Sequence, residues 1–392
     1  MSVKSQVKND LGTKFYHVTF NTVNHQINYQ KVIRYFIYLV TFLLFIVIVA
    51  TLAAINIRYA NNGKYNFHDL FLIFSTNNIF SNNTDQINNL TNSTGSTFGS
   101  LNFIDLVPIK KATWISIATV IAGIGLAVTG AVIQGITKNP LSDPTTLGTT
   151  EAVIFGAILM NVLVGSFVSA DIFQYVYLAF GFLGGLLAVG FILIIIRQKS
   201  NLDYLKITLS GLAISIFFKT VSFILRSSSK NALKTSFAIS IGGAENVYGL
   251  YPSQETILYL AILLIAIGTI VSIFIAKNLS ILELGDNKAA SLGVNTKLVK
   301  IISLIIVLIL VPTAITLVGN VAFVGLFVPH IIRIIFKTRN YLIIIPLGAL
   351  LGGLVMNLGL TFNTFFASIP SSIYMVFIGA PMLIYLGWKQ KG

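Results

Sequence analysis

Long runs of apolar residues, separated by short polar connections, repeat along this chain from residue 33 to residue 386. Most of these runs approach the roughly 20 residues that an α-helix needs to cross a bilayer. Phe323–Phe336 is too short for an ordinary lipid-facing helix, so we expect neighbouring helices to enclose it. The pattern predicts ten membrane spans, at about Ile33–Ile57, Thr113–Ile133, Leu147–Val164, Phe173–Ile196, Leu205–Leu225, Ile257–Ala276, Ile301–Val318, Phe323–Phe336, Leu342–Leu360 and Tyr374–Leu386.

The composition agrees with this pattern. Of the 392 residues, 55% are hydrophobic and only 10% are charged, whereas an average soluble domain carries about 25% charged residues. We therefore predict an all-α, polytopic transmembrane helical bundle. Glycines within the spans are expected to let helix backbones approach closely, because lipid gives helices no hydrophobic drive to associate. They are Gly123, Gly125, Gly130, Gly181, Gly184, Gly185, Gly348, Gly352 and Gly353.

The net charge of +14 could indicate a nucleic-acid partner, but the distribution of the basic residues argues against one. They gather in short loops after every second span, for example at Arg197 and Lys199, at Lys297 and Lys300, and at Lys389. Loops rich in lysine and arginine are typically cytoplasmic. Because the number of predicted spans is even, both termini are expected on the cytoplasmic side.

Two polar stretches lie outside the predicted spans. Residues 1–32 are interpreted as a cytoplasmic tail, which precedes a transmembrane domain over residues 33–392. Residues 58–111 are predicted to form an Asn-rich loop on the outer side, longer than a connection between spans requires. The first apolar run is too long for the core of a signal peptide and lacks a small-residue cleavage pattern. The chain has no cysteine, which excludes disulfides and thiolate metal sites.

The polar segment Glu283–Asn295 stands between two predicted spans and has a composition unlike theirs. Its helix-forming residues run from Asp286 to Leu292, with Gly285 and Gly293 at the two ends. A helix of this length is not stable alone, and a loop between spans does not need one. We therefore predict a short helix at the cytoplasmic membrane surface on which another protein docks.

A second unusual connection joins the second and third predicted spans. Asn139-Pro140 and Asp143-Pro144 place two prolines close together, which prohibits a continuous helix. Asn and Asp side chains bond the nearby backbone and favour tight turns. The segment is therefore predicted to be a rigid cytoplasmic connection. An ordinary Asx-Pro loop without a further role is the alternative.

The short apolar segment near residue 325 carries Pro329, His330 and Arg333. His330 and Arg333 are three residues apart and share a helix face. Ionisable groups at membrane depth are usually functional, although this pair lies near the cytoplasmic end, where an arginine can extend to the interface. A hydrogen-bonded structural histidine is the favoured interpretation over a metal ligand.

Four motifs, in order and at matching spacing, resemble the permease subunits of the FecCD-type ABC importers for iron–siderophores, haem and cobalamin. The resemblance covers roughly residue 110 to the C-terminus. The motifs are Gln134…Asn139-Pro-Leu-Ser-Asp-Pro144…Leu147-Gly148, then Glu283-Leu-Gly-Asp…Ala289-Ala-Ser-Leu-Gly-Val-Asn295, then Gly325-Leu-Phe-Val-Pro-His-Ile-Ile-Arg333, and Ile378-Gly-Ala-Pro381.

The resemblance implies a ten-helix subunit with the permease fold of type II ABC importers, in a bacterial cell membrane. It implies a second permease subunit across a central pathway, a cytoplasmic ATPase dimer and an outer substrate-binding lipoprotein. It implies no cofactor, metal site or catalytic residue in this chain. The segment of residues 283–295 would couple the permease to the ATPase through Glu283, Leu284, Gly285, Asp286, Ala289, Ala290, Leu292 and Gly293.

The resemblance also assigns roles to other residues. Asn139, Pro140, Leu141, Asp143 and Pro144 would form the inner gate and its loop, and Gly325, Pro329, His330, Arg333 and Pro381 would shape the structure or pathway. Arg58 and Lys64 are candidates for docking the binding protein, with solvated charge as the favoured alternative. Ser368-Ile-Pro370 and Met356-Asn-Leu-Gly359 stand where the family often has an acidic residue.

Three classes of function are weighed. A passive subunit of an ATP-driven importer fits best, because the chain has no nucleotide-binding Gly-rich loop ending in Gly-Lys-Ser/Thr and the short helix offers a docking site. An ion-coupled secondary carrier would need acidic groups at mid-membrane, but Glu151 lies near a span end and Lys219 is the one obvious mid-span charge. A membrane enzyme lacks a recognisable catalytic motif. As substrate, a ferric siderophore ranks first, haem second and cobalamin third.

Overall fold

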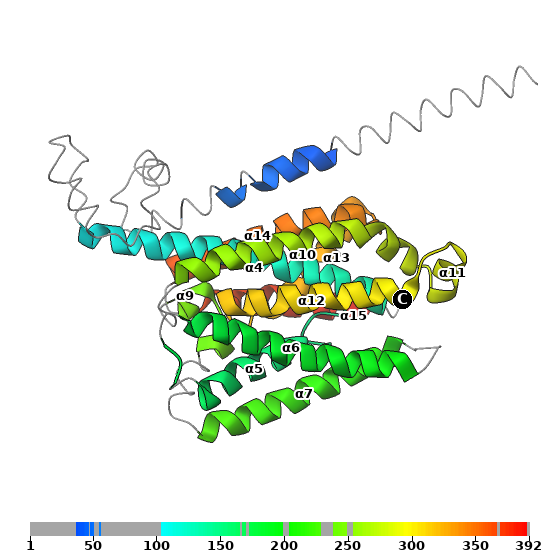
Figure 1. Cartoon of the computed structure of the whole chain (residues 1–392). Helices are drawn as coiled ribbons and strands as arrows, with labels where there is room; N and C mark the ends of the chain where they lie inside the picture. Colours follow the sequence, from blue (N-terminus) through cyan, green and yellow to red (C-terminus); the bar gives the residue numbers. More distant parts are fainter. Residues whose placement is uncertain are drawn as a thin grey trace, which may run out of the picture. The chain divides into compact units, whose positions relative to one another are not determined.

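The computed structural model describes residues 37–46, 48–50, 55, 103–164, 167–169, 172–198, 204–228, 238–248, 254–366 and 369–389. The described residues are helices joined by turns and short connections (Figure 1). The chain divides into two compact units, residues 1–47 and residues 48–392. In the first, residues 37–46 are described as helix. The remainder of the description concerns the second unit.

Six described helices are long and apolar enough to span a membrane, and four shorter apolar helices accompany them. These ten correspond one to one with the predicted spans, which confirms the polytopic all-α fold. The labelled helices are α4 (Phe103–Thr137), α5 (Thr149–Leu163), α6 (Phe173–Gln198), α7 (Tyr204–Ser228), α9 (Ala244–Val247), α10 (Gln254–Leu282), α11 (Asp286–Ser291), α12 (Thr296–Val318), α13 (Val324–Phe336), α14 (Tyr341–Phe365) and α15 (Ser371–Lys389).

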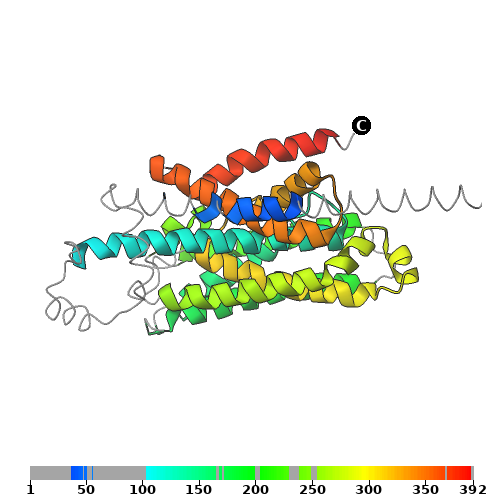
Figure 2. The ribbon, with the colours of Figure 1, turned by 90° about the horizontal axis from the view of Figure 1, so that it is seen from above.

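Helix α4 is the centre of one half of this unit. It packs against α10, α12, α13 and α14, and Figures 1 and 2 both show it beside α14. Helix α12 also contacts α5 and α6, and α5 packs against α6 and α7. The bundle therefore consists of a half built on α4 and a half made of α5, α6 and α7, with α12 contacting both.

Glycine pairs bring the helix backbones together, as predicted from the sequence. A Cβ added at Gly123 of α4 would overlap the carbonyl group of Gly352 in α14. The same holds for Gly130 of α4 against Gly325 of α13, and for Gly184 of α6 against the backbone of α5. Because no side chain separates these backbones, the helices gain close van der Waals contact in place of a hydrophobic drive.

Two of the apolar helices are too short to cross a bilayer alone. Helix α5 has 15 residues and α13 has 13, against the roughly 20 that a span needs. The residues of α13 from Val324 to Pro329 are buried, as expected for an enclosed element, whereas Ile334 and Ile335 in its last turn are exposed.

The helix ends differ from the predicted spans. Helix α4 begins at Phe103, so the last part of the predicted loop 58–111 is helical. Helix α10 continues to Leu282, beyond the predicted end at Ala276. Hydropathy fails to locate these ends because helices continue into polar sequence wherever other helices support them. Residues 1–32 and 58–102, with Arg58 and Lys64, lie outside the described residues.

Candidate functional site

The short helix predicted within residues 283–295 is present as α11. It is bounded by Gly285 with φ 114° and Gly293 with φ 82°, and glycine adopts such conformations without steric cost. The N–H of Gly293 donates to the carbonyl of Ala290, and that of Val294 donates to the carbonyl of Ala289. These two bonds form a Schellman C-cap, which confirms that the glycine closes this helix.

The side chains of this segment face two environments. Ala289 is fully buried, whereas Leu284 and Leu292, on either side of α11, are 58% and 61% exposed. Ala290 is also exposed, and Glu283 is half-buried. The buried alanine seats α11 on the bundle, and the exposed leucines leave apolar surface at both of its ends.

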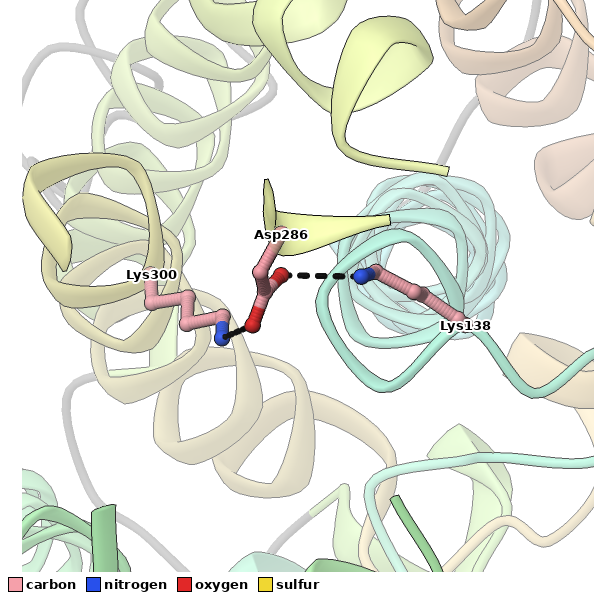
Figure 3. A network of polar contacts seen from close by, with 3 residues as sticks. All are labelled: Lys138, Asp286 and Lys300. Carbon is pink, nitrogen blue, oxygen red and sulfur yellow. Dashed lines mark hydrogen bonds and ion pairs between the residues drawn. The ribbon is translucent and has the colours of Figure 1, made fainter. Parts of the chain in front are cut away.

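Asp286, the first residue of α11, joins three elements (Figure 3). Its Oδ1 lies 2.8 Å from Nζ of Lys138, at the end of α4, and its Oδ2 lies 2.6 Å from Nζ of Lys300, on α12. The lysine side chains are only 9% exposed, and that of Asp286 is 31% exposed. We call these three residues the Asp286 cluster. It fixes α11 to the ends of two long helices.

The two lysines also control the ionisation of Asp286. Partial burial by itself raises the pKa of this carboxyl group. The hydrogen bonds and positive charges of Lys138 and Lys300 outweigh burial and hold the pKa below its ordinary value of 3.8. The aspartate is therefore a stable anion at neutral pH.

The connection between α4 and α5 starts at Lys138 and has the predicted rigid turns. Lys138 ends α4 with φ 52°. The Asn139 side chain accepts from the N–H of Leu141 at 2.9 Å, and the Asp143 side chain accepts from the N–H of Thr145 at 3.1 Å. Each Asx-Pro pair thus closes its own turn. The structure confirms the turns, while the gating role remains a prediction.

This connection packs against the beginning of α13. Asp143 and Pro144 are buried, and the Asp143 carboxylate accepts a hydrogen bond from the backbone of Phe323. A Cβ at Gly325 would lie 3.2 Å from Cδ of Pro144. The predicted gate residues and Gly325 therefore meet in space.

Arg333 is held within the bundle by two partners, so it is not a solvated end-of-helix charge. It donates to Oε1 of Gln134 and, at 2.9 Å, to the hydroxyl of Tyr341. Gln134 in turn donates to the carbonyls of Gly325 and Leu326, each at 3.1 Å. This network ties α13 to α4 and α14.

The remaining candidates are placed as follows. His330 is half-buried, and Pro329 is buried within α13. Pro381 lies within α15, and Gly379 of the same motif contacts Phe323. The structure thus brings the last motif to the start of α13.

Sequence reasoning missed several residues that the structure brings to these motifs. From the sequence, Lys300 is predicted only as a basic loop charge, and no role is predicted for Lys138. Glu245 accepts bonds from the N–H of Ser371 at 2.6 Å and from its hydroxyl at 2.9 Å, so it caps α15. That helix follows Ser368-Ile-Pro370, where the family often has an acidic residue; here Glu245 of the short helix α9 supplies a carboxylate.

A polytopic bundle with a short helix outside its spans, tied by charge to the ends of those spans, favours a transport protein that receives a partner on that helix. The FecCD transport family model matches residues 70–389. This chain belongs to that family, and it is a transmembrane permease subunit of an ABC importer.

Relatives and a solved structure agree with this assignment. FhuB, the iron(3+)-hydroxamate import permease of Bacillus subtilis, is 30% identical over 70% of this chain and 69% of its own. YfmD, the Fe(3+)-citrate import permease of the same organism, is 30% identical over 69% of this chain and 78% of its own. A metal-chelate type ABC transporter in an inward-facing conformation has a TM-score of 0.68 at 20% identity, over 90% of this chain and 99% of that one; this likeness shows the fold.

Proposed function

We propose that this permease forms the pathway for an iron chelate and that α11 is the element through which an ATPase drives it. A ferric siderophore is the first candidate substrate and haem the second. A binding lipoprotein would deliver the chelate on the outer side. The α11 end of the bundle would then face the cytoplasm, as would both termini, and a second permease subunit would complete the pathway.

The single observation that carries this proposal is the Asp286 cluster. Asp286 is paired with Lys138, which immediately precedes the turn closed by Asn139 and Leu141. A displacement of α11 would therefore be transmitted to that turn. Solvent-exposed ion pairs contribute little to stability. The two lysines of the Asp286 cluster are almost covered, so their ion pairs are expected to be stronger than exposed ones. A force applied to α11 would therefore move the connection between α4 and α5, the proposed inner gate.

The exposed surface of α11 supports docking of an ATPase. Leu284 and Leu292 present apolar side chains at both ends of α11, and Ala290 is exposed between them. ATP binding can drive transport only if the ATPase has different affinities for the outward-open and inward-open states. A rigid α11 that moves with the gate would provide that difference.

Replacement of Asp286–Leu292 by a Gly/Ser linker of equal length tests the proposal. We expect ATP-dependent iron-chelate uptake to be lost and the amount of inserted permease to be unchanged, because the spans are left intact. Copurification of the ATPase should fall in parallel. The control is Gly190→Ala on α6, where an added Cβ meets nothing within 4 Å, which should leave uptake unaltered. Full uptake through the linker variant would reject the coupling role.

A further inference from the structure

Helix α7 differs from the other long helices in how little of it is covered. Of its most apolar 18 residues, 17% are buried, against 78% for the corresponding part of α4 and 33% for α10. Its packed side is a narrow stripe that includes Gly211, Phe218 and Ser222. Most of the other residues from Leu209 to Ser227 are exposed, including Phe217, Lys219 and Phe223.

Lys219 lies on the exposed side of α7 at membrane depth. It is residue 16 of 25 in the helix. If the ~37 Å helix is centred on a hydrocarbon layer of ~30 Å, its Cα lies about 11 Å inside the nearer edge. An extended lysine side chain does not reach that edge. Because charged groups at this depth rarely face lipid, this side of α7 must border a water-filled path or another protein.

Two further charges lie along the same surface. Backbone contacts at Gly148 and Gly211 bring the start of α5 against α7, and Phe155 lies 5.2 Å from Phe218 between ring centroids. Glu151, one turn before Phe155, therefore lies beside the part of α7 that precedes Lys219.

The charges of Lys219 and Arg226 both act on the Glu151 carboxylate. Arg226 follows Lys219 by seven residues, two helix turns, and so lies on the same face. We call Glu151, Lys219 and Arg226 the Glu151 row. It contains two cations and one anion. Lys219 is exposed, whereas Glu151 and Arg226 are half-buried and Arg226 lies near the end of α7, so the exposed positive charge at membrane depth is that of Lys219.

We propose that the Glu151 row is an anion-binding site in the translocation pathway and that it selects iron chelates of net negative charge. Lys219 and Arg226 would attract the chelate, and Glu151 would limit the cost of holding two cations within the membrane. This inference rests on the proposed function and adds the charge of its substrate. Family membership leaves that charge open, because one relative imports iron(3+)-hydroxamate and another Fe(3+)-citrate.

The test measures ATP-dependent uptake of radioactive iron by the complete importer in cells. Ferric citrate and a ferric catecholate complex serve as anionic chelates, and a ferric trihydroxamate with a neutral core serves as the uncharged one. Lys219→Met removes the charge at similar length, and Lys219→Arg keeps it. Lys297→Met, an exposed lysine at the α11 end of α12, is the matched control. For each chelate, the uptake by the variant is divided by the uptake by wild type. This ratio removes the binding protein's own preference among the chelates.

For an anionic chelate, we expect Lys219→Met to raise KM about tenfold or more, since a hydrogen-bonded charge is lost. Lys219→Arg should retain most uptake, and Lys297→Met should equal wild type. If the wild-type importer took up only the neutral chelate and neither anionic one, the inference would be overturned. So would an equal loss for all chelates, or a change in the size of the complex, because either would make Lys219 structural. Absence of any ATP-dependent uptake by wild type would instead reject the proposed function itself, and the inference with it.

Discussion

The Asp286 cluster and the Glu151 row have the same composition, one carboxylate with two cationic side chains, but opposite geometry. In the Asp286 cluster each carboxylate oxygen touches one ammonium group, and the lysines are almost fully covered. In the Glu151 row the charges act on one another along two helices, and Lys219 is exposed. The first set lies in the half built on α4, and the second lies in the half made of α5, α6 and α7.

The difference shows how packing decides what a charge can do. Where several helices converge, as they do around α4, the charges satisfy one another and act as a mechanical link. Where a helix is left largely uncovered, as α7 is, a charge such as that of Lys219 stays exposed and available to a ligand. We therefore expect loss of charge in the Asp286 cluster to affect coupling, and loss of charge in the Glu151 row to affect substrate selection.

The largest effect is expected from Gly130→Ala in the half built on α4. The added methyl group would overlap the backbone of Gly325, so α13 would have to move away from α4, at a cost of about 3 kcal/mol. The amount of folded permease in the membrane, and its melting temperature in detergent, should both fall. Gly190→Ala on α6, where a Cβ meets nothing within 4 Å, is the control. Equal stability of the two variants would contradict the close backbone contact between α4 and α13.

An intermediate effect is expected within the Asp286 cluster, where the two lysines should differ. Lys138→Met severs the link to the proposed gate and should lower uptake about tenfold, within the usual range of coupling energies. Lys300→Met leaves that link in place and should lower uptake by a smaller factor. Uptake and ATPase activity are measured together, because loss of uptake with retained hydrolysis identifies uncoupling. Equal losses for both lysines would mean that the cluster only stabilises α11.

The smallest effect is the pH dependence of the Asp286 cluster. Because the folded pKa of Asp286 is below its ordinary value, its ion pairs add stability that is fully present above the unfolded pKa, about 3.9. This contribution is lost as the pH falls through the folded pKa. The difference in melting temperature between wild type and Asp286→Asn should therefore be constant from about pH 5 to pH 8 and shrink only in stronger acid. A difference that changes around pH 6 to 7 would show that another group is responsible.

Several parts of the site follow from local sequence. Gly285 and Gly293 mark the ends of α11, and the Asx-Pro pairs at Asn139 and Asp143 mark the turns, because each depends on the conformational preference of a residue and its neighbours. The partners of Asp286 could not be found in this way. Lys138 is 148 residues away, and nothing in a list of basic residues distinguishes it from the others.

The sequence by itself determined the ten apolar helices, the helix at residues 286–291 and the rigid turns that follow α4, because hydropathy and backbone preference act over a few residues. Only the tertiary structure decided which distant groups meet. It placed Gly130 against Gly325, brought Glu245 to the start of α15, and left Lys219 uncovered. Those outcomes depend on how the helices pack, and packing depends on the fit of whole helix surfaces to one another.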